Sequence, residues 1–225
     1  MKIDCGAGKI LHVNKEAVHH VFGFPMGDYT VPRPSDTGHN AALSKLKAEL
    51  GCESNASIDT KDLRDLLAKL VKDETKVDLA VKVFFSILYT KLICPGPAVR
   101  IGREAAMLVD MDYDKMASMD FRQLVVDELK RSVEKYQNTK VKNTGPEGCG
   151  IVPVTMYLDS CHSPKLSVMH RNTPRANFLY EKTLRAIYLQ DRIHNGRSDL
   201  SKYIFGKWPV SELLICITSE LAFLI

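Results

Sequence analysis

The stretch that most constrains the fold is LAVKVFFSILYTKLICP, residues 79–95, which is apolar on most sides. An apolar run of this length predicts a helix. The residue before a proline is pushed out of the helical region, so Cys94-Pro95 should end this helix. A helix without a polar face has to be covered by other elements. We therefore expect a helical core built around residues 79–95.

Helical periodicity continues on both sides of this segment. Asn14 is a suitable N-cap for a helix that ends before Gly23, and another helix should run from about His39 to Gly51. An amphipathic stripe at i, i+3, i+4 and i+7 predicts a further helix after a cap at Asp59 or Thr60. Its members are Leu63, Leu66, Leu67 and Leu70.

The remaining segments complete an all-α prediction. A short helix is expected over residues 103–108, a long one over 121–136, and another around 180–188. Residues 151–159 fit either a strand or a helix with Pro153 in its first turn. No segment shows sustained strand alternation, so we predict an all-α fold: a single orthogonal multi-helix domain with long loops.

One domain over residues 1–225 is the expectation, with a linker near 139–148 as the place of a subdivision into 1–138 and 149–225. Residues 209–225 read as a core helix. A membrane tail anchor is the weaker alternative, because Glu212 and Glu220 would be costly in lipid. The final apolar residues have no cap, which is typical of a truncated gene product.

Composition narrows the class of protein. Of the 225 residues 45% are hydrophobic and 26% charged, which is ordinary for a globular protein, and the net charge is +4. The six cysteines are scattered without a CxxC pair, and residues 1–25 lack a secretory signal. We expect a nuclear or cytoplasmic protein that is not secreted, crosses no membrane and keeps its thiols reduced.

Cys149 is the most plausible nucleophile by its surroundings, since it lies between two glycines and is followed by His162 and His170. Catalytic triads depend on convergence in space, however, and sequence neighbours seldom supply one. The spacing C-x11-C-H-x7-H also lacks the paired short spacings of zinc sites. We predict no catalytic residue, no metal and no cofactor, and keep a thiol enzyme using Cys149 as a weaker alternative.

Residues 160–207 form the most basic part of the chain, with nine basic residues against three acidic ones. Such an excess is suited to a phosphate backbone, although charge on the outer face of a helix is usually only solvated. The nucleic-acid contacts predicted on this basis are Arg171, Arg175, Arg185, Arg192 and Arg197.

Three segments carry a resemblance to a known set of proteins. Residues 19–27, HHVFGFPMG, resemble the "VHxVLGxPxGG" entry of uncharacterised plant proteins abundant in grasses. Residues 84–95, FFSILYTKLICP, resemble their central helix with its "LLCP" ending. Residues 148–159, GCGIVPVTMYLD, resemble their "GCxxxLQxxYLD" helix, and Pro174-Arg175 matches a "PR" that follows it.

The resemblance covers roughly residues 15–195. In that set of proteins, this all-helical region is similar to the plant mobile domain. In transposon-derived genes this helical region often stands N-terminal to a Ulp1-type cysteine protease. Met26 and Phe121 depart from the expected pattern, and the His, Asp, Gln and Cys series of the protease is absent from this sequence. The resemblance therefore implies an origin and a context, and no catalytic residue.

Taken together, the sequence predicts a non-enzymatic helical interaction module of transposon origin, with an unknown protein partner. One alternative is the non-catalytic N-terminal portion of a Ulp1-like, SUMO- or ubiquitin-directed cysteine protease. Another is a nucleic-acid-binding protein that acts through residues 160–207.

Overall fold

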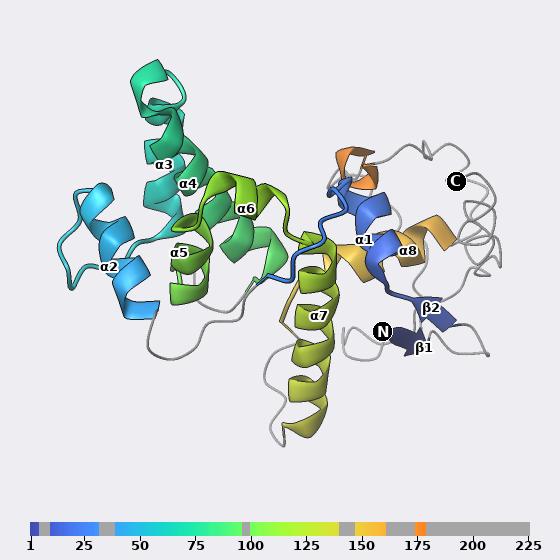
Figure 1. Cartoon of the computed structure of the whole chain (residues 1–225). Helices are drawn as coiled ribbons and strands as arrows, with labels where there is room; N and C mark the ends of the chain where they lie inside the picture. The colour runs from blue at the N-terminus through green and yellow to red at the C-terminus, as the bar shows by residue number, and fades with distance from the viewer. Residues whose placement is uncertain (5–9, 32–38, 96–99, 140–146, 161–173, 179–225) are drawn as a thin grey trace, which may run out of the picture. The chain divides into compact units, whose positions relative to one another are not determined.

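The computed structural model describes residues 1–4, 10–31, 39–95, 100–139, 147–160 and 174–178 (Figure 1). Over these residues the chain is mainly helical, with one small two-stranded sheet, so the predicted fold class is confirmed. The described residues fall into two compact units. The first joins Met1–Pro25 to the part of the chain that starts at Gly150, and the second is Met26–Cys149. The predicted single domain stays a prediction.

The first unit begins with a hairpin. Strands β1 (Lys2–Asp4) and β2 (Ile10–His12) pair antiparallel, with Lys2 opposite His12 and Asp4 opposite Ile10. Helix α1 (Lys15–Phe22) follows, and it contacts both α8 (Ile151–Ser160) and the 3-10 turn η3 (Arg175–Phe178). Strand β2 contacts α8 as well.

Both ends of α1 follow from local sequence signals, as predicted. The Asn14 side chain accepts a hydrogen bond from the backbone N–H of Ala17 at 2.9 Å, which satisfies one of the free amides of the first turn. Gly23 ends the helix in the left-handed region at φ 69°, where a residue without Cβ is favoured. Between these caps Val18 and Val21 are fully buried.

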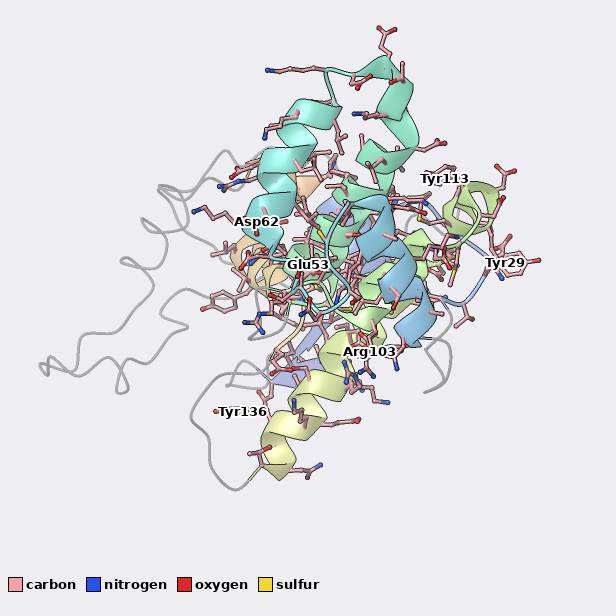
Figure 2. The ribbon with its side chains drawn as sticks, turned by 90° about the vertical axis from the view of Figure 1, so that its left-hand side faces the viewer. Tyr29, Glu53, Asp62, Arg103, Tyr113 and Tyr136 are labelled. Carbon is pink, nitrogen blue, oxygen red and sulfur yellow. The ribbon has the colours of Figure 1, made fainter. Side chains whose placement is uncertain are left out.

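The second unit holds the other helices, which Figure 2 shows with their side chains. They are α2 (His39–Glu49), α3 (Thr60–Leu70), a 3-10 turn η1 (Glu74–Lys76), α4 (Val77–Leu88), a π-helical turn η2 (Tyr89–Ile93), α5 (Arg103–Val109), α6 (Tyr113–Ala117) and α7 (Phe121–Asn138). Helix α4 contacts α3, α5 and η2, and α2 packs on α5. Asp59, Asp112 and Asp120 cap α3, α6 and α7 with their carboxylates.

The predicted central helix ends where Cys94-Pro95 requires, but its last turn is wider than an α-helical one. The Cys94 amide donates to the carbonyl of Tyr89 at 2.8 Å, five residues back, and closes η2. Tyr89 and Ile93 in this turn are buried. Cys94 is the C-cap of this widened turn.

Two features of the structure are not apparent from the sequence pattern. Arg122 of α7 is a charged residue, yet it is only 6% exposed and its Nε lies 3.4 Å from the carboxylate of Asp120. The hairpin at residues 2–12 was not expected in an all-α chain. Two strands of three residues each are too short to show an alternating pattern.

No helix among the described residues has the length and apolar character needed to span a bilayer. The expected core helix or tail anchor at residues 209–225 lies outside the described residues, as does the helix expected around residues 180–188.

Candidate functional site

Of the five arginines predicted to contact nucleic acid, only Arg175 lies among the described residues. Arg175 is buried, with 1% of its surface exposed, so its guanidinium is not presented to a phosphate backbone. Arg171, Arg185, Arg192 and Arg197 lie outside the described residues. The basic segment could not reveal the burial of Arg175, because the carboxylate that pairs with it lies sixteen residues earlier, on another element.

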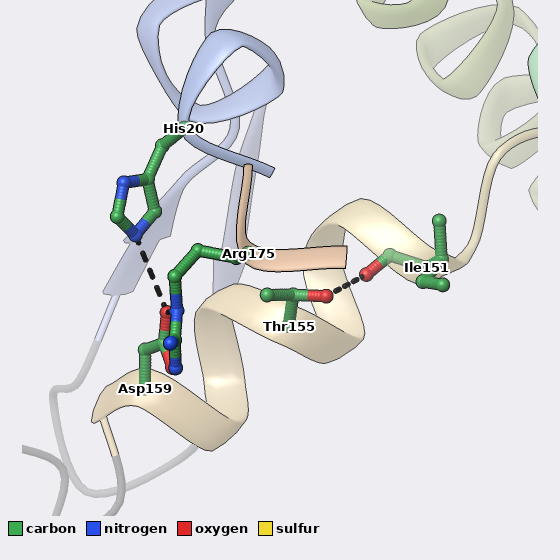
Figure 3. A network of polar contacts seen from close by, with 5 residues as sticks. All are labelled: His20, Ile151, Thr155, Asp159 and Arg175. Atoms are coloured by element: carbon green, nitrogen blue, oxygen red, sulfur yellow. Dashed lines mark hydrogen bonds and ion pairs between the residues drawn. The ribbon is translucent and has the colours of Figure 1, made fainter. Parts of the chain in front are cut away.

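Arg175 belongs to what we call the Asp159 cluster: His20, Asp159 and Arg175 (Figure 3). The Nε of Arg175 donates to Asp159 Oδ2 at 2.7 Å, and its Nη2 donates to Oδ1. His20 Nε2 lies 3.4 Å from Asp159 Oδ2. The three side chains come from η3, α8 and α1, so one carboxylate joins three elements of the first unit.

His20 and Arg175 keep the carboxyl group of Asp159 ionised. Burial alone would raise the pKa of this carboxyl, but hydrogen bonds from His20 and Arg175 outweigh burial and lower the pKa below its ordinary value. A carboxylate held ionised by a bidentate arginine is a weak proton acceptor. The arrangement therefore suits a structural tie better than general acid–base chemistry.

Cys149 is buried, with 1% of its surface exposed. The preceding Gly148 adopts φ 93°, and its amide donates to the carbonyl of Pro95 at 3.2 Å, which fixes the turn before the cysteine. Such burial is typical of a structural thiol, since reactive cysteines need access. His162 and His170 lie outside the described residues.

The acidic residues 110–114 have structural partners in the described region. Asp112 caps α6 by accepting from the Asp114 amide at 2.9 Å, and Asp110 pairs with Lys45. Within the described residues no three His, Cys, Asp or Glu side chains converge in a way that would hold a metal ion.

We call the exposed side chains of Val77 and Phe84 on α4, together with Tyr113 of the neighbouring α6, the α4 surface. Val77 is 55% exposed and Phe84 48% exposed, and they lie seven residues apart on one face of the helix. Tyr113 of α6 adjoins the first turn of α4, because its hydroxyl donates to the carbonyl of Asp78 at 3.0 Å. Figure 2 shows Tyr113 at the periphery of the helices.

The Phe84 ring also belongs to a row of three aromatic rings within the second unit. Its ring meets that of Phe85 edge-on, with centroids 5.5 Å apart, and the Phe85 ring stacks on Phe121 of α7 at 6.4 Å. Phe84 is therefore linked, through the half-buried Phe85, to the buried Phe121. The sequence alone did not reveal the α4 surface, because an all-apolar helix gives no sign of which side lacks a neighbour.

Comparison with known proteins relates the chain to one family. A family model described as Domain of unknown function (DUF8566) matches residues 1–152, more than half of the chain. No curated protein and no solved structure matches the chain.

Proposed function

This chain belongs to the family described as Domain of unknown function (DUF8566), and we propose that it is a non-enzymatic helical interaction module that binds a protein partner through the α4 surface. The observation that carries the proposal is the exposure of Phe84, at 48%, on the most apolar helix among the residues that the structure describes. Exposed apolar side chains that gather on one face mark interaction sites more often than single scattered ones do.

The geometry of the α4 surface favours a helical partner. Val77 and Phe84 lie seven residues apart on one face of α4, which is the spacing of apolar anchor residues where one helix binds another. Covering the exposed half of Phe84 would contribute about 1 kcal/mol to binding by burial of apolar area. We infer an amphipathic helix of another protein as the occupant.

Site-specific photo-crosslinking in the native cell tests this proposal. A photoreactive amino acid at position 84 should give a discrete crosslinked protein, and the same amino acid at position 130, an exposed site on α7, should not. Phe84→Glu should then abolish co-purification of that protein, whereas Lys130→Glu should leave it unchanged. Equal crosslinking from both positions, or binding that survives Phe84→Glu, would contradict the proposal.

Transposon origin and action in the nucleus are further parts of the proposal, and they are supported only by the resemblance of residues 15–195 to the plant mobile domain. Sequencing the native transcript beyond codon 225 tests the alternative context. A continuing frame with a Ulp1-type His, Asp and Cys series would make this chain the non-catalytic part of a protease. A fluorescent fusion of the natural gene product tests the nuclear location.

The nucleic-acid alternative now depends on Arg171, Arg185, Arg192 and Arg197, because Arg175 is buried. It predicts binding of DNA or RNA that weakens as salt rises and is lost when Arg185 and Arg192 become Glu. No binding at low salt would exclude this alternative.

A further inference from the structure

The charges beside the α4 surface are unevenly distributed along α4. Asp78 lies in the first turn of this helix, and Asp112 and Asp114 stand on either side of Tyr113 in the sequence. All three aspartates are exposed. Residues 79–93, which continue α4 through η2, include no carboxylate. Negative charge therefore gathers at the end of the α4 surface where Tyr113 lies.

A contact between α6 and α4 brings the three aspartates to the same place. The Tyr113 hydroxyl donates to the carbonyl of Asp78 at 3.0 Å, so α6 begins beside the first turn of α4. The Asp112 carboxylate accepts from the amides of Asp114 and Lys115, at 2.9 and 3.4 Å, which holds it at the start of α6. We call Asp78, Asp112 and Asp114 the acidic rim of the α4 surface.

One lysine beside the acidic rim is not enough to balance its charge. Lys115 follows Asp114 and is exposed. Three other lysines are paired with carboxylates outside the rim: Lys45 with Asp110, Lys76 with Asp73 and Lys82 with Glu49. Within the described part of the chain no ion pair includes a member of the rim. The three carboxylates and Lys115 together leave an excess of two negative charges.

The pKa of Tyr113 agrees with a negative potential at this end of the surface. Burial raises the pKa of its hydroxyl above the ordinary value, and the carboxylates of Asp78 and Glu49 raise it further. A negative potential beside an exposed aromatic ring favours a positively charged partner.

Apolar side chains extend from the acidic rim along one face of α4. Val77 and Phe84 are its exposed members, and the half-buried Val81 and Leu88 lie on the same face. Apolar residues at i, i+4, i+7 and i+11 are spaced to meet the apolar face of a second helix. Charges that flank such a face determine which helix binds, because unlike charges favour association and like charges oppose it.

We propose that the partner of the α4 surface is a basic amphipathic helix, whose Lys or Arg side chains lie opposite the acidic rim. This inference rests on the proposed function, because it specifies the chemistry of the occupant of the same surface. The whole chain has a net charge of +4 and would by itself attract an acidic helix. A preference for a basic helix therefore has to come from the local charge of the rim.

Fluorescence anisotropy with two synthetic peptides tests the proposal on the full chain. Both peptides are amphipathic helices of about five turns with leucine on the apolar face, and they carry either lysine or glutamate beside that face. The lysine peptide should bind saturably and about tenfold more tightly than the glutamate peptide. Its affinity should fall as salt rises, because salt screens exposed charges. Phe84→Ala should weaken its binding about fivefold.

A matched pair of double variants tests the acidic rim itself. Asp78→Asn with Asp114→Asn should weaken binding of the lysine peptide about fivefold, and Asp112 is left in place because it caps α6. Asp62→Asn with Asp65→Asn removes the same charge from α3 and should change the affinity less than about twofold. Figure 2 shows Asp62 and Tyr113 on different sides of the second unit.

The outcomes separate the basic partner from the proposed function. A glutamate peptide that binds as tightly as the lysine peptide, or equal effects of the two double variants, would overturn the basic partner. If Phe84→Ala still weakened peptide binding in that case, the proposed function would stand. Failure of both peptides to bind, or binding that does not respond to Phe84→Ala, would overturn both proposals.

Discussion

Gly27 lies against the backbone of the residues that precede α7. A Cβ at this position would stand 2.2 Å from both the carbonyl carbon and the carbonyl oxygen of Met119. This approach is fixed by the bridge beside it, where the Tyr29 amide donates to Ser118 O at 3.0 Å and Asp120 N donates to Tyr29 O at 2.7 Å. Gly27→Ala should therefore lower the free energy of unfolding by about 3 kcal/mol, measured by urea denaturation.

Gly102→Ala is the matched control, because no atom lies within 4 Å of a Cβ built at Gly102. We expect it to change the free energy of unfolding by at most about 1 kcal/mol, the scale of an N-cap substitution. Equal costs for the two substitutions would show that the contact of Gly27 with Met119 does not exist in solution.

A second prediction concerns the contribution of the Asp159 charge to stability. Asp159→Asn leaves the buried guanidinium of Arg175 without its counter-charge and should cost about 3 kcal/mol at pH 7. The pKa of Asp159 is lowered in the folded state, so its charge stabilises the protein above the ordinary carboxyl pKa and ceases to do so as pH falls. The difference in free energy of unfolding between the wild type and Asp159→Asn should become smaller below about pH 4. Urea denaturation at several pH values measures this difference.

The exposed ion pair of Arg64 and Asp65 serves as a control for the buried pair of Asp159 and Arg175. Arg64 and Asp65 are 3.8 Å apart with both side chains largely exposed, so Asp65→Asn should cost less than about 0.5 kcal/mol. The double variant Asp159→Asn with Arg175→Met should recover part of the loss, because it removes the unpaired charge. A cost for Asp159→Asn as small as that for Asp65→Asn would contradict the buried cluster.

At the scale of elements, α4 separates a core face from an exposed face within two consecutive residues. Val83 is fully buried, whereas Phe84 is 48% exposed. Val83→Ala should cost about 2 kcal/mol in the free energy of unfolding, and Phe84→Ala less than about 1 kcal/mol despite its larger loss of volume. Denaturation of the two variants in parallel measures this, and the reverse order would place Phe84 in the core.

A feature of these elements can be predicted from the sequence when the residues that cause it lie within a few positions of one another. Asn14 and Gly23 fix α1 through contacts within a few residues, so both ends of that helix were predictable. The burial of Arg175 and the exposure of Phe84 depend on partners far along the chain.

At the scale of the whole molecule, the residues Met26–Cys149 form a unit with its own buried side chains, among them Val83, Ala106 and Val125. A unit with its own core is expected to fold alone. The isolated fragment should show a helical circular dichroism spectrum and cooperative urea unfolding. Val83→Ala should cost the same in the fragment as in the full chain, within about 0.5 kcal/mol, and an uncooperative fragment would contradict this expectation.

The other unit is built from the beginning of the chain and from residues after Gly150, and this order matters during synthesis. Val18 and Val21 of α1 leave the ribosome long before α8 is translated, since about 130 codons separate Val21 from Ile151 and translation adds roughly ten residues per second. For more than ten seconds the nascent chain carries the apolar face of α1 while the helix that packs on it does not yet exist. Ribosome-associated chaperones that recognise apolar segments would meet the apolar face of α1 while Met26–Cys149 is still emerging.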